Sequence, residues 1–264
     1  MTWAVVQRRV VDWAPAVAVF VLGIAAWQGL VAAFNVQEFL LPKPTVIAQT
    51  FWDERSSLWH AGIYTFKEAL GGFALGSSLG IAVALVFAAF RPLGTAFIPF
   101  AVAASAIPII AFAPIFNNWF GLLNPFSKMA IAAVLCFFPV LVNTLRGLTS
   151  VDPRAIELMR SYAAGRVSIF RRVRIPASLP HMFAGLKIAS VLSMIGAIVG
   201  EYFGGPITAL GVLILNASAY TNFPVAWAGI VVASAFGILF YGAVALAERL
   251  TTSWDPSRRD FHTE

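Results

Sequence analysis

A polar stretch from Asp152 to Pro180, DPRAIELMRSYAAGRVSIFRRVRIPASLP, holds the most chemically distinctive residues of this chain. Asp152 followed by Pro153 is typical of a helix start, because the carboxylate can accept a backbone amide and proline at the first helical position loses no hydrogen bond. We expect a short helix to follow and to end at a turn that Gly165 permits. A second short helix then carries four arginines and stops at Pro176; the four are Arg166, Arg171, Arg172 and Arg174.

The first of these helices is predicted to be amphipathic. Ile156, Met159 and Ala163 fall on one face at spacings of three and four residues, whereas Arg154 and Arg160 lie off it. This pattern indicates a small helix with an apolar face and a basic surround, held at the membrane surface. Two interpretations stay open: a contact element for another protein, or an arginine-rich loop that only sets membrane topology.

Ionisable residues in or beside apolar segments are functional candidates, because charge is costly in a bilayer. They are Lys67, Glu68, Lys128, Lys187 and Glu201. We expect Glu68 and Glu201 to lie toward the outer side, at a gate or substrate entrance. Lys187 is close enough to the inner boundary for its ammonium group to reach the interface.

A proline-interrupted segment ends in Asn117, Asn118 and Trp119. Broken helices are tolerated in membranes where they face protein or a water-filled cavity, and amide side chains can line such a pathway. The alternative places these residues in the outer interface, within an aromatic belt.

Several chemistries are excluded by the absence of their motifs. The chain has no GxxxxGK[ST] phosphate loop, no HExxH and no plausible serine–histidine–acid arrangement. Its histidines, His60, His181 and His262, are too scattered for a metal site, and Cys136 is the only cysteine. We expect no catalytic residue, no metal and no cofactor bound by this chain.

The composition requires a membrane setting for these residues. Of 264 residues, 59% are hydrophobic and only 11% are charged, against ~25% charged in a soluble domain. The net charge of +6 would suggest nucleic acid in a soluble protein. Here the basic residues flank apolar runs, so membrane topology explains them better.

Six apolar stretches are long enough to span a bilayer, which takes ~20 residues. They cover about 13–34, 67–90, 97–119, 127–146, 181–203 and 224–247. The first exceeds the ~7–15-residue core of a signal peptide, so we interpret it as a retained span. Between the first two spans, residues 46–52 are predicted to form an interfacial helix, either a docking surface or a helix resting on headgroups.

The arginines define the orientation. With the N-terminus in the cytoplasm, thirteen arginines fall on the inside, which is a strong positive-inside pattern. Both termini and the polar loop at 150–180 are then cytoplasmic. The prediction is one all-α transmembrane domain over 1–264, a six-helix bundle in a bacterial inner (plasma) membrane.

Glycines at intervals of four residues recur in the second and fifth predicted spans. This spacing lets helix backbones approach closely, which favours association in lipid. The two sets are Gly72, Gly76 and Gly80, and Gly196, Gly200 and Gly204.

The polar loop resembles the EAA loop of permease subunits of bacterial ABC importers. That pattern is EAA, three residues, Gly, nine residues and I-x-L-P. Glu157 matches the glutamate, and Val173-Arg174-Ile175-Pro176 falls at the right distance for the ending. Leu158 and Met159 replace the alanines, and Ala163 occupies the glycine position, with Gly165 two residues later. The resemblance extends over nearly all of the chain, and it is strongest to the nitrate, sulfonate, taurine and thiamine-precursor branch.

This resemblance implies the fold of type I ABC importer permeases (the MetI-like fold) and a set of partners. The loop would couple this chain to an ATPase subunit dimer that binds ATP and Mg. An outside, periplasmic or extracellular, substrate-binding protein would deliver the solute, and a second copy of the permease would complete the path as a homodimer. The coupling residues would be Asp152, Ile156, Glu157, Met159, Arg160, Ala163, Gly165 and Pro176.

The resemblance also bears on the substrate. In sulfonate-type members the position of Glu68 is commonly arginine, which suits an anion, whereas the precursor-type members resemble this chain more closely around Glu68–Phe73 and Phe137–Pro139. With Glu201 as a second acid, an anion would meet unfavourable charge. We therefore expect a nitrogen heterocycle such as a pyrimidine, thiamine precursor or related vitamin; nitrate, sulfonate or taurine is the alternative. Two alternatives lie outside the class of ABC importer permeases: a secondary transporter and a membrane scaffold protein.

Overall fold

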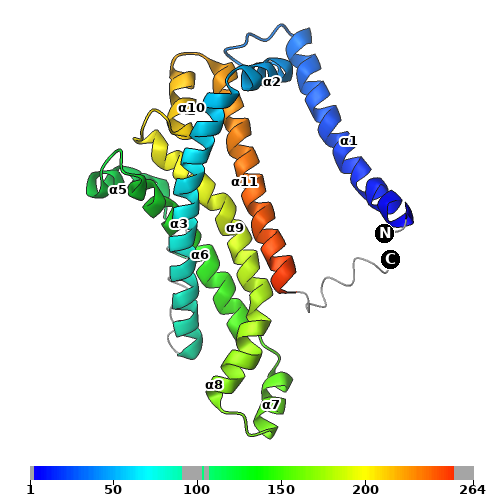
Figure 1. The fold of residues 1–264 in the computed structure, drawn as a ribbon, viewed down its shortest axis with the longest axis vertical. Helices are drawn as coiled ribbons and strands as arrows, with labels where there is room; N and C mark the ends of the chain where they lie inside the picture. Colours follow the sequence, from blue (N-terminus) through cyan, green and yellow to red (C-terminus); the bar gives the residue numbers. More distant parts are fainter. Residues whose placement is uncertain (1–2, 91–102, 104–106, 253–264) are drawn as a thin grey trace.

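The structure, a computed structural model, describes residues 3–90, 103 and 107–252. All regular secondary structure within these residues is helical. The long helices run roughly side by side, with short helices at both ends of the molecule (Figure 1). We name these ends by their helices: the α7 end, at the bottom of Figure 1, and the α2 end, at its top.

Five segments of the described chain are long and apolar enough to cross a membrane. Their helices are α1 (Trp3–Ala33), α3 (Arg55–Ala89), α6 (Pro125–Thr149), α9 (Ile175–Tyr202) and α11 (Phe223–Thr251). Each contains one of the predicted spans, to within a few residues at the ends. The first part of the predicted span at 97–119, residues 97–102 and 104–106, lies outside the described residues. The six-helix count and the location of the termini therefore stay predictions.

The described end of that remaining segment is broken into short pieces. The 3₁₀ helix η1 (Ile109–Phe112) follows Pro108, and α5 (Ala113–Phe120) has Pro114 in its first turn. Proline fits these positions because its missing amide would have no intrahelical partner there.

The centre of the bundle is formed by α3, α6 and α9, which meet through the predicted glycines. A methyl group at Gly80 would lie 2.8 Å from the Phe137 carbonyl oxygen, and one at Gly196 would lie 2.8 Å from Ala132 Cα. Gly72, Gly76 and Gly200 likewise face α6. Small residues thus let three backbones approach closely.

Gly204 is the exception, and its predicted helix-packing role is wrong. The helix α9 ends at Tyr202, and Gly204 lies in the following turn with φ +141°. Only glycine adopts this region readily. It is therefore a turn glycine, close to Leu122.

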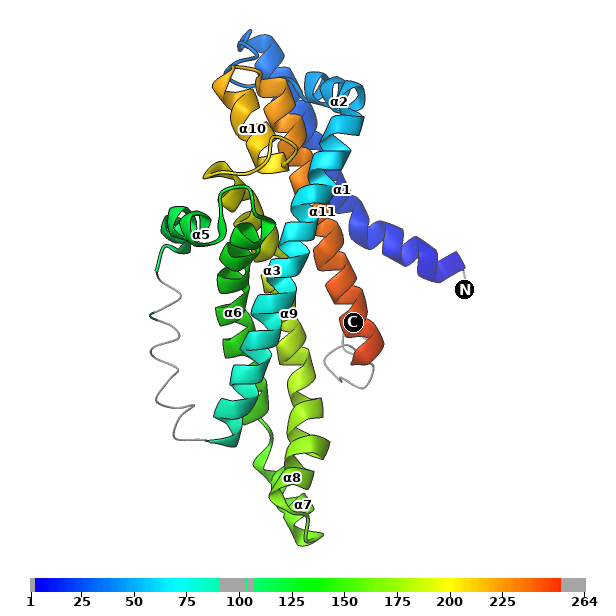
Figure 2. The same ribbon diagram turned by 60° about the vertical axis from the view of Figure 1, so that its left-hand side comes forward.

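Two short helices lie at the α2 end (Figures 1 and 2). The first, α2 (Pro44–Asp53), confirms the helix predicted at 46–52. The second, α10 (Leu210–Ala219), was not predicted, since ten residues are too few to span a bilayer. It packs on α9 and α11, within a cluster that includes Leu210, Ile214 and Val232.

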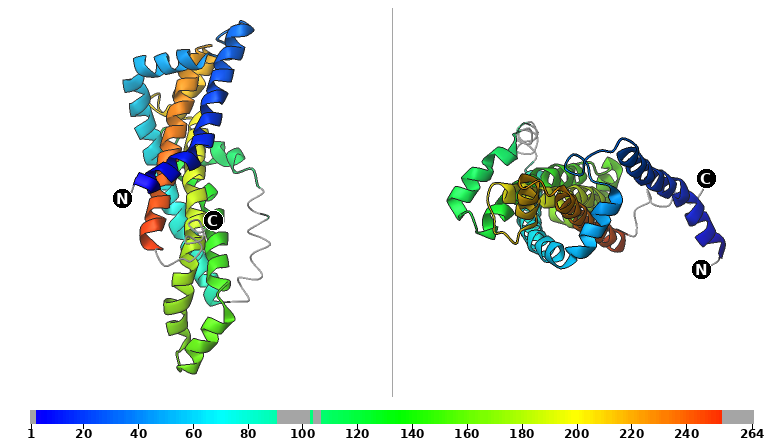
Figure 3. Two further views of the ribbon diagram at one scale, coloured as in Figure 1. Left: turned by 90° about the vertical axis from the view of Figure 1, so that its right-hand side faces the viewer. Right: turned by 90° about the horizontal axis from the view of Figure 1, so that it is seen from above.

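The helix α1 diverges from the rest of the molecule (Figure 3). It contacts the other helices near its C-terminal end, where the Trp27 and Trp227 rings lie 5.2 Å apart and the Gln28 side chain bonds Thr45. Its apolar window is only 6% buried. The other four candidate spans therefore hold together without most of its surface.

Candidate functional site

The polar loop forms the helix α7 (Pro153–Ser161) at one extreme of the molecule (Figure 2). Its start confirms the sequence prediction: the Asp152 carboxylate accepts the Arg154 amide at 2.9 Å, and Pro153 occupies the first turn. Such a cap is worth about 1 kcal/mol. A local sequence signal therefore determines where this element begins.

The turn after α7 is built differently from the prediction. Gly165 has φ −70°, an extended conformation open to any residue, and precedes α8 (Arg166–Ile169). The left-handed residue is Ala163, with φ +54°, at the position where the EAA loop pattern has glycine. Ala163 therefore holds a conformation that costs a non-glycine residue about 1–2 kcal/mol. The prediction that Gly165 makes this turn is wrong, whereas its role in coupling stays a prediction.

Pro176 does not end the second helix either. The chain continues from α8 through a π-helical turn, η2 (Phe170–Arg174), into α9. In this turn the Ile175 amide bonds the Phe170 carbonyl. The wider turn accommodates a proline that lacks an amide, so the helix passes it without a break. The segment Arg166–Tyr202 is thus one continuous rod of 37 residues.

The rod is anchored to its neighbours at the α7 end. Phe170 and Ile175 pack against a cluster of Leu141, Leu145 and Leu148 on α6, which also includes Ala84 and Ala88 on α3. A methyl group at Gly147 on α6 would lie 2.9 Å from Ser178 Cα. The η2 turn and the start of α9 are therefore packed against α6 and the end of α3.

The helix α7 keeps an exposed face. Leu158 is 58% exposed and Tyr162 76%, and Glu157, next to Leu158, is also exposed. Ile156 and Met159 are half-buried on the inner side. An exposed apolar pair beside a carboxylate, on a short stiff helix, is suited to contact another protein.

A second group of polar residues lies inside the bundle. The Glu201 carboxyl group, in the last turn of α9, accepts the Thr65 hydroxyl at 2.6 Å and the Gly211 amide at 2.6 Å. Thr65 in turn accepts the Leu210 amide at 3.0 Å. The first amides of a helix lack intrahelical partners and attract negative charge. Glu201 and Thr65 therefore hold the start of α10 against α3 and α9.

Glu68 and Lys128 extend this group, and both are buried. The Lys128 ammonium donates to the Leu122 carbonyl. Glu68 interacts electrostatically with Glu201 and Lys128, yet neither of its carboxylate oxygens makes a hydrogen bond of ordinary geometry within the described residues. We name Thr65, Glu68, Lys128 and Glu201 the buried polar cluster.

Comparison with known proteins identifies the chain. Residues 76–253 match the family described as binding-protein-dependent transport system inner membrane component. The chain belongs to this family. It is an ABC transporter permease embedded in the membrane.

Relatives of the permease are named for different solutes. It is 33% identical over 233 residues to a riboflavin transport system permease of Chloroflexus aurantiacus, covering 88% of this chain and 86% of the relative. It is 34% identical over 236 residues to a formylaminopyrimidine transport permease of Halalkalibacterium halodurans, covering 89% and 93%. A putative aliphatic sulfonates transport permease of Bacillus subtilis is 29% identical over 234 residues, covering 88% and 84%.

The predicted path residues of the permease do not all lie in one environment. Glu68 and Glu201 come together, in the interior rather than at an exposed entrance. Asn117 is buried, and its amide has no hydrogen-bond partner among the described residues. Asn118 and Trp119 are exposed on α5, so they suit a pathway and an interface equally. The path or gate role of all five residues stays a prediction.

Two contacts of the permease were missed by sequence reasoning. Lys187 pairs with Glu248 on α11, with Nζ and Oε2 2.8 Å apart, and its position at the membrane interface stays a prediction. Thr65 and the start of α10 were not recognised as partners of Glu201. The available signal was an acid and a base within two apolar segments, which must be paired somewhere.

Proposed function

We propose that this permease forms half of the transmembrane path of an ATP-driven importer for a small nitrogen heterocycle. The observation that carries the substrate class is the Glu68 carboxyl group in the buried polar cluster. Neither of its oxygens has a hydrogen-bond partner of ordinary geometry among the described residues. A solute that reaches this group during transport would gain a hydrogen bond from an N–H donor of a neutral or cationic heterocycle, whereas an anion has no donor to offer it.

The named relatives are consistent with this class. Two of them, at 33% and 34% identity, are named for riboflavin and formylaminopyrimidine, both nitrogen heterocycles. Sulfonate transport is the second candidate, because a sulfonate-named relative matches a similar share of the chain at 29% identity.

We propose that α7 and α8 form the coupling element for a separate ATPase dimer, which would bind ATP and Mg. The exposed Leu158, Glu157 and Tyr162 would make the contact. The continuous segment Arg166–Tyr202 would carry its motion into the bundle. Alternating access would then follow from rigid-body motion of packed helices.

The proposed assembly has two copies of the permease, a binding protein outside and both termini in the cytoplasm of a bacterial inner membrane. The exposed face of α1 is consistent with a further helix partner. In this assembly the permease itself performs no covalent chemistry. A secondary transporter or a scaffold protein would need no ATPase, and copurification of an ATPase subunit separates these alternatives.

The test is uptake by the reconstituted complex with its ATPase and binding protein. Radiolabelled riboflavin, a formylaminopyrimidine, an alkanesulfonate and nitrate should be compared at equal concentration, with and without ATP. ATP-dependent uptake of a heterocycle and not of the anions is the expected result. Preferential uptake of the sulfonate or nitrate would overturn the proposed substrate class.

A further inference from the structure

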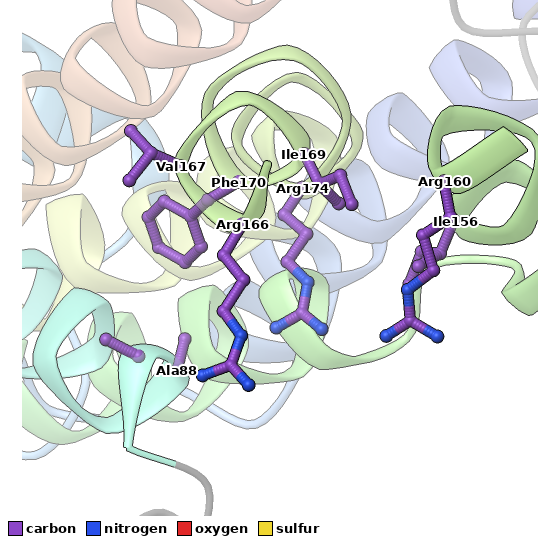
Figure 4. Close-up of a pocket in the computed structure, with 9 residues that line it drawn as sticks. Ala88, Ile156, Arg160, Arg166, Val167, Ile169, Phe170 and Arg174 are labelled. Carbon is purple, nitrogen blue, oxygen red and sulfur yellow. The ribbon is translucent and has the colours of Figure 1, made fainter. Parts of the chain in front are cut away.

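An arginine-lined cleft of about 570 Å³ lies between the end of α3 and the α7–α8–η2 segment. Arg160, Arg166 and Arg174 line its polar side, and Ala88, Val167 and Phe170 contribute apolar atoms. The three guanidinium groups project to the same side of their helices (Figure 4). We name this feature the arginine cleft.

The charge of the cleft favours an anionic ligand. No acidic side chain is among the described residues that line it. Guanidinium groups stay protonated at all physiological pH values, so Arg160 and Arg166 keep their positive charge at this space. A phosphate group suits such a lining, because its oxygens accept paired hydrogen bonds from the planar guanidinium.

The position and the apolar wall of the cleft define the ligand further. Ala88 belongs to the last turn of α3, a helix apolar enough to cross a membrane. Val167, beside Arg166, is 73% exposed. The cleft therefore offers cationic groups where a span ends and an apolar surface next to them. Free phosphate has no apolar group to contact this surface, whereas a phospholipid has both a phosphate group and acyl chains.

We propose that the arginine cleft binds the headgroup of an anionic phospholipid. Basic pockets between membrane helices on the cytoplasmic side bind such headgroups in other proteins. A lipid held here would bridge the end of α3 to α7 and α8, the proposed coupling element. Activity of the transporter would then depend on the anionic lipid content of its membrane.

The experiment measures lipid retention by the intact permease–ATPase complex. The complex is reconstituted in phosphatidylcholine with or without phosphatidylglycerol, extracted gently, and weighed by native mass spectrometry. The wild type should retain phosphatidylglycerol in preference to phosphatidylcholine. The double variant Arg166→Gln/Arg174→Gln should bind it at least about tenfold more weakly, since hydrogen bonds to charged groups are lost.

A matched control removes the same charge elsewhere. Arg171 and Arg172 are exposed and do not line the cleft, so Arg171→Gln/Arg172→Gln should bind the lipid like the wild type. Arg166→Lys/Arg174→Lys keeps the charge and loses the paired geometry, and it should bind with intermediate strength. Size-exclusion profiles in phosphatidylcholine establish that each variant is folded.

Three results would overturn the proposal. Equal loss of lipid in both glutamine pairs would mean unspecific attraction to basic residues. Displacement of the lipid by millimolar inorganic phosphate would identify a site for a free anion. Retention by the permease alone, but not by the complex, would assign the cleft to acidic residues of the ATPase.

Discussion

The Gly211 amide donates a hydrogen bond of 2.6 Å to the Glu201 carboxyl group, and this bond connects the end of α9 to the start of α10. Thr65 on α3 adds a second bond to the same carboxyl group and a third to the Leu210 amide. All of these groups are buried. A single acidic side chain therefore holds together three helices that are distant in sequence.

Glu201→Leu should loosen the start of α10. The substitution leaves the Gly211 amide and the Thr65 hydroxyl without their buried acceptor, which costs about 1–3 kcal/mol each. The expected result is a lower thermal unfolding midpoint and faster hydrogen exchange at residues 210 and 211. Glu157→Leu, on the exposed face of α7, is the control and should change neither. Unchanged exchange in Glu201→Leu would contradict the assigned role.

The Lys187–Glu248 pair should behave as one unit. Each side chain is mostly buried, at 24% and 11% exposure, so Lys187→Met removes the ammonium group that Glu248 binds, and Glu248→Met removes the carboxylate that Lys187 binds. Either change should lower stability by about 3 kcal/mol. The double variant should lose less than the sum of the two, and a thermodynamic cycle measures the difference. Strict additivity would mean that the two groups contribute independently.

The sequence predicts that glycine is needed at position 165, whereas the turn after α7 in the structure predicts that glycine is favoured at position 163. Ala163→Gly should retain or raise stability, because glycine relieves the left-handed strain at φ +54°. Gly165→Ala should be tolerated, since its φ is −70° and, apart from its chain neighbours, no described residue has an atom within 4 Å of the added methyl group. Ala163→Val should impair the turn, as branched residues rarely accept positive φ. Uptake and thermal unfolding of the assembled complex would measure all three.

Reversal of charge at Glu157 should impair coupling and leave the fold intact. Glu157 is exposed, and loss of an exposed charge usually costs only ~0–1 kcal/mol. Glu157→Lys adds positive charge beside Arg154 and Arg160, at the proposed contact with the ATPase. Uptake and substrate-stimulated ATP hydrolysis should fall together, while insertion stays normal. Normal uptake at normal expression would remove Glu157 from the contact.

The predicted orientation can be tested with two cysteines at opposite ends of the molecule. Ser168→Cys should react only with a reagent on the cytoplasmic side, and Thr208→Cys only with one outside. Cys136 is fully buried, so background labelling should be low. Labelling of both positions from the same side of sealed, oriented vesicles would refute the predicted topology.

Much of this protein is determined by sequence alone. Apolar runs of about 20 residues predict membrane helices because unpaired backbone groups are too costly in lipid, and five such runs correspond to described helices. The start of α7 follows from Asp152 and Pro153, because a cap is a contact between near neighbours in sequence. The glycine spacing on α3 predicts close helix contacts for a similarly local reason.

The tertiary structure decides what local patterns cannot contain. Glu201 receives its partners from α3 and α10, and Lys187 receives its partner from α11, across intervals that no helical period relates. The left-handed residue is Ala163 and not Gly165, because the placement of α7 and α8 sets the backbone there and overrides residue preference. A buried acid must find a partner, and only the packed chain determines which one is within reach.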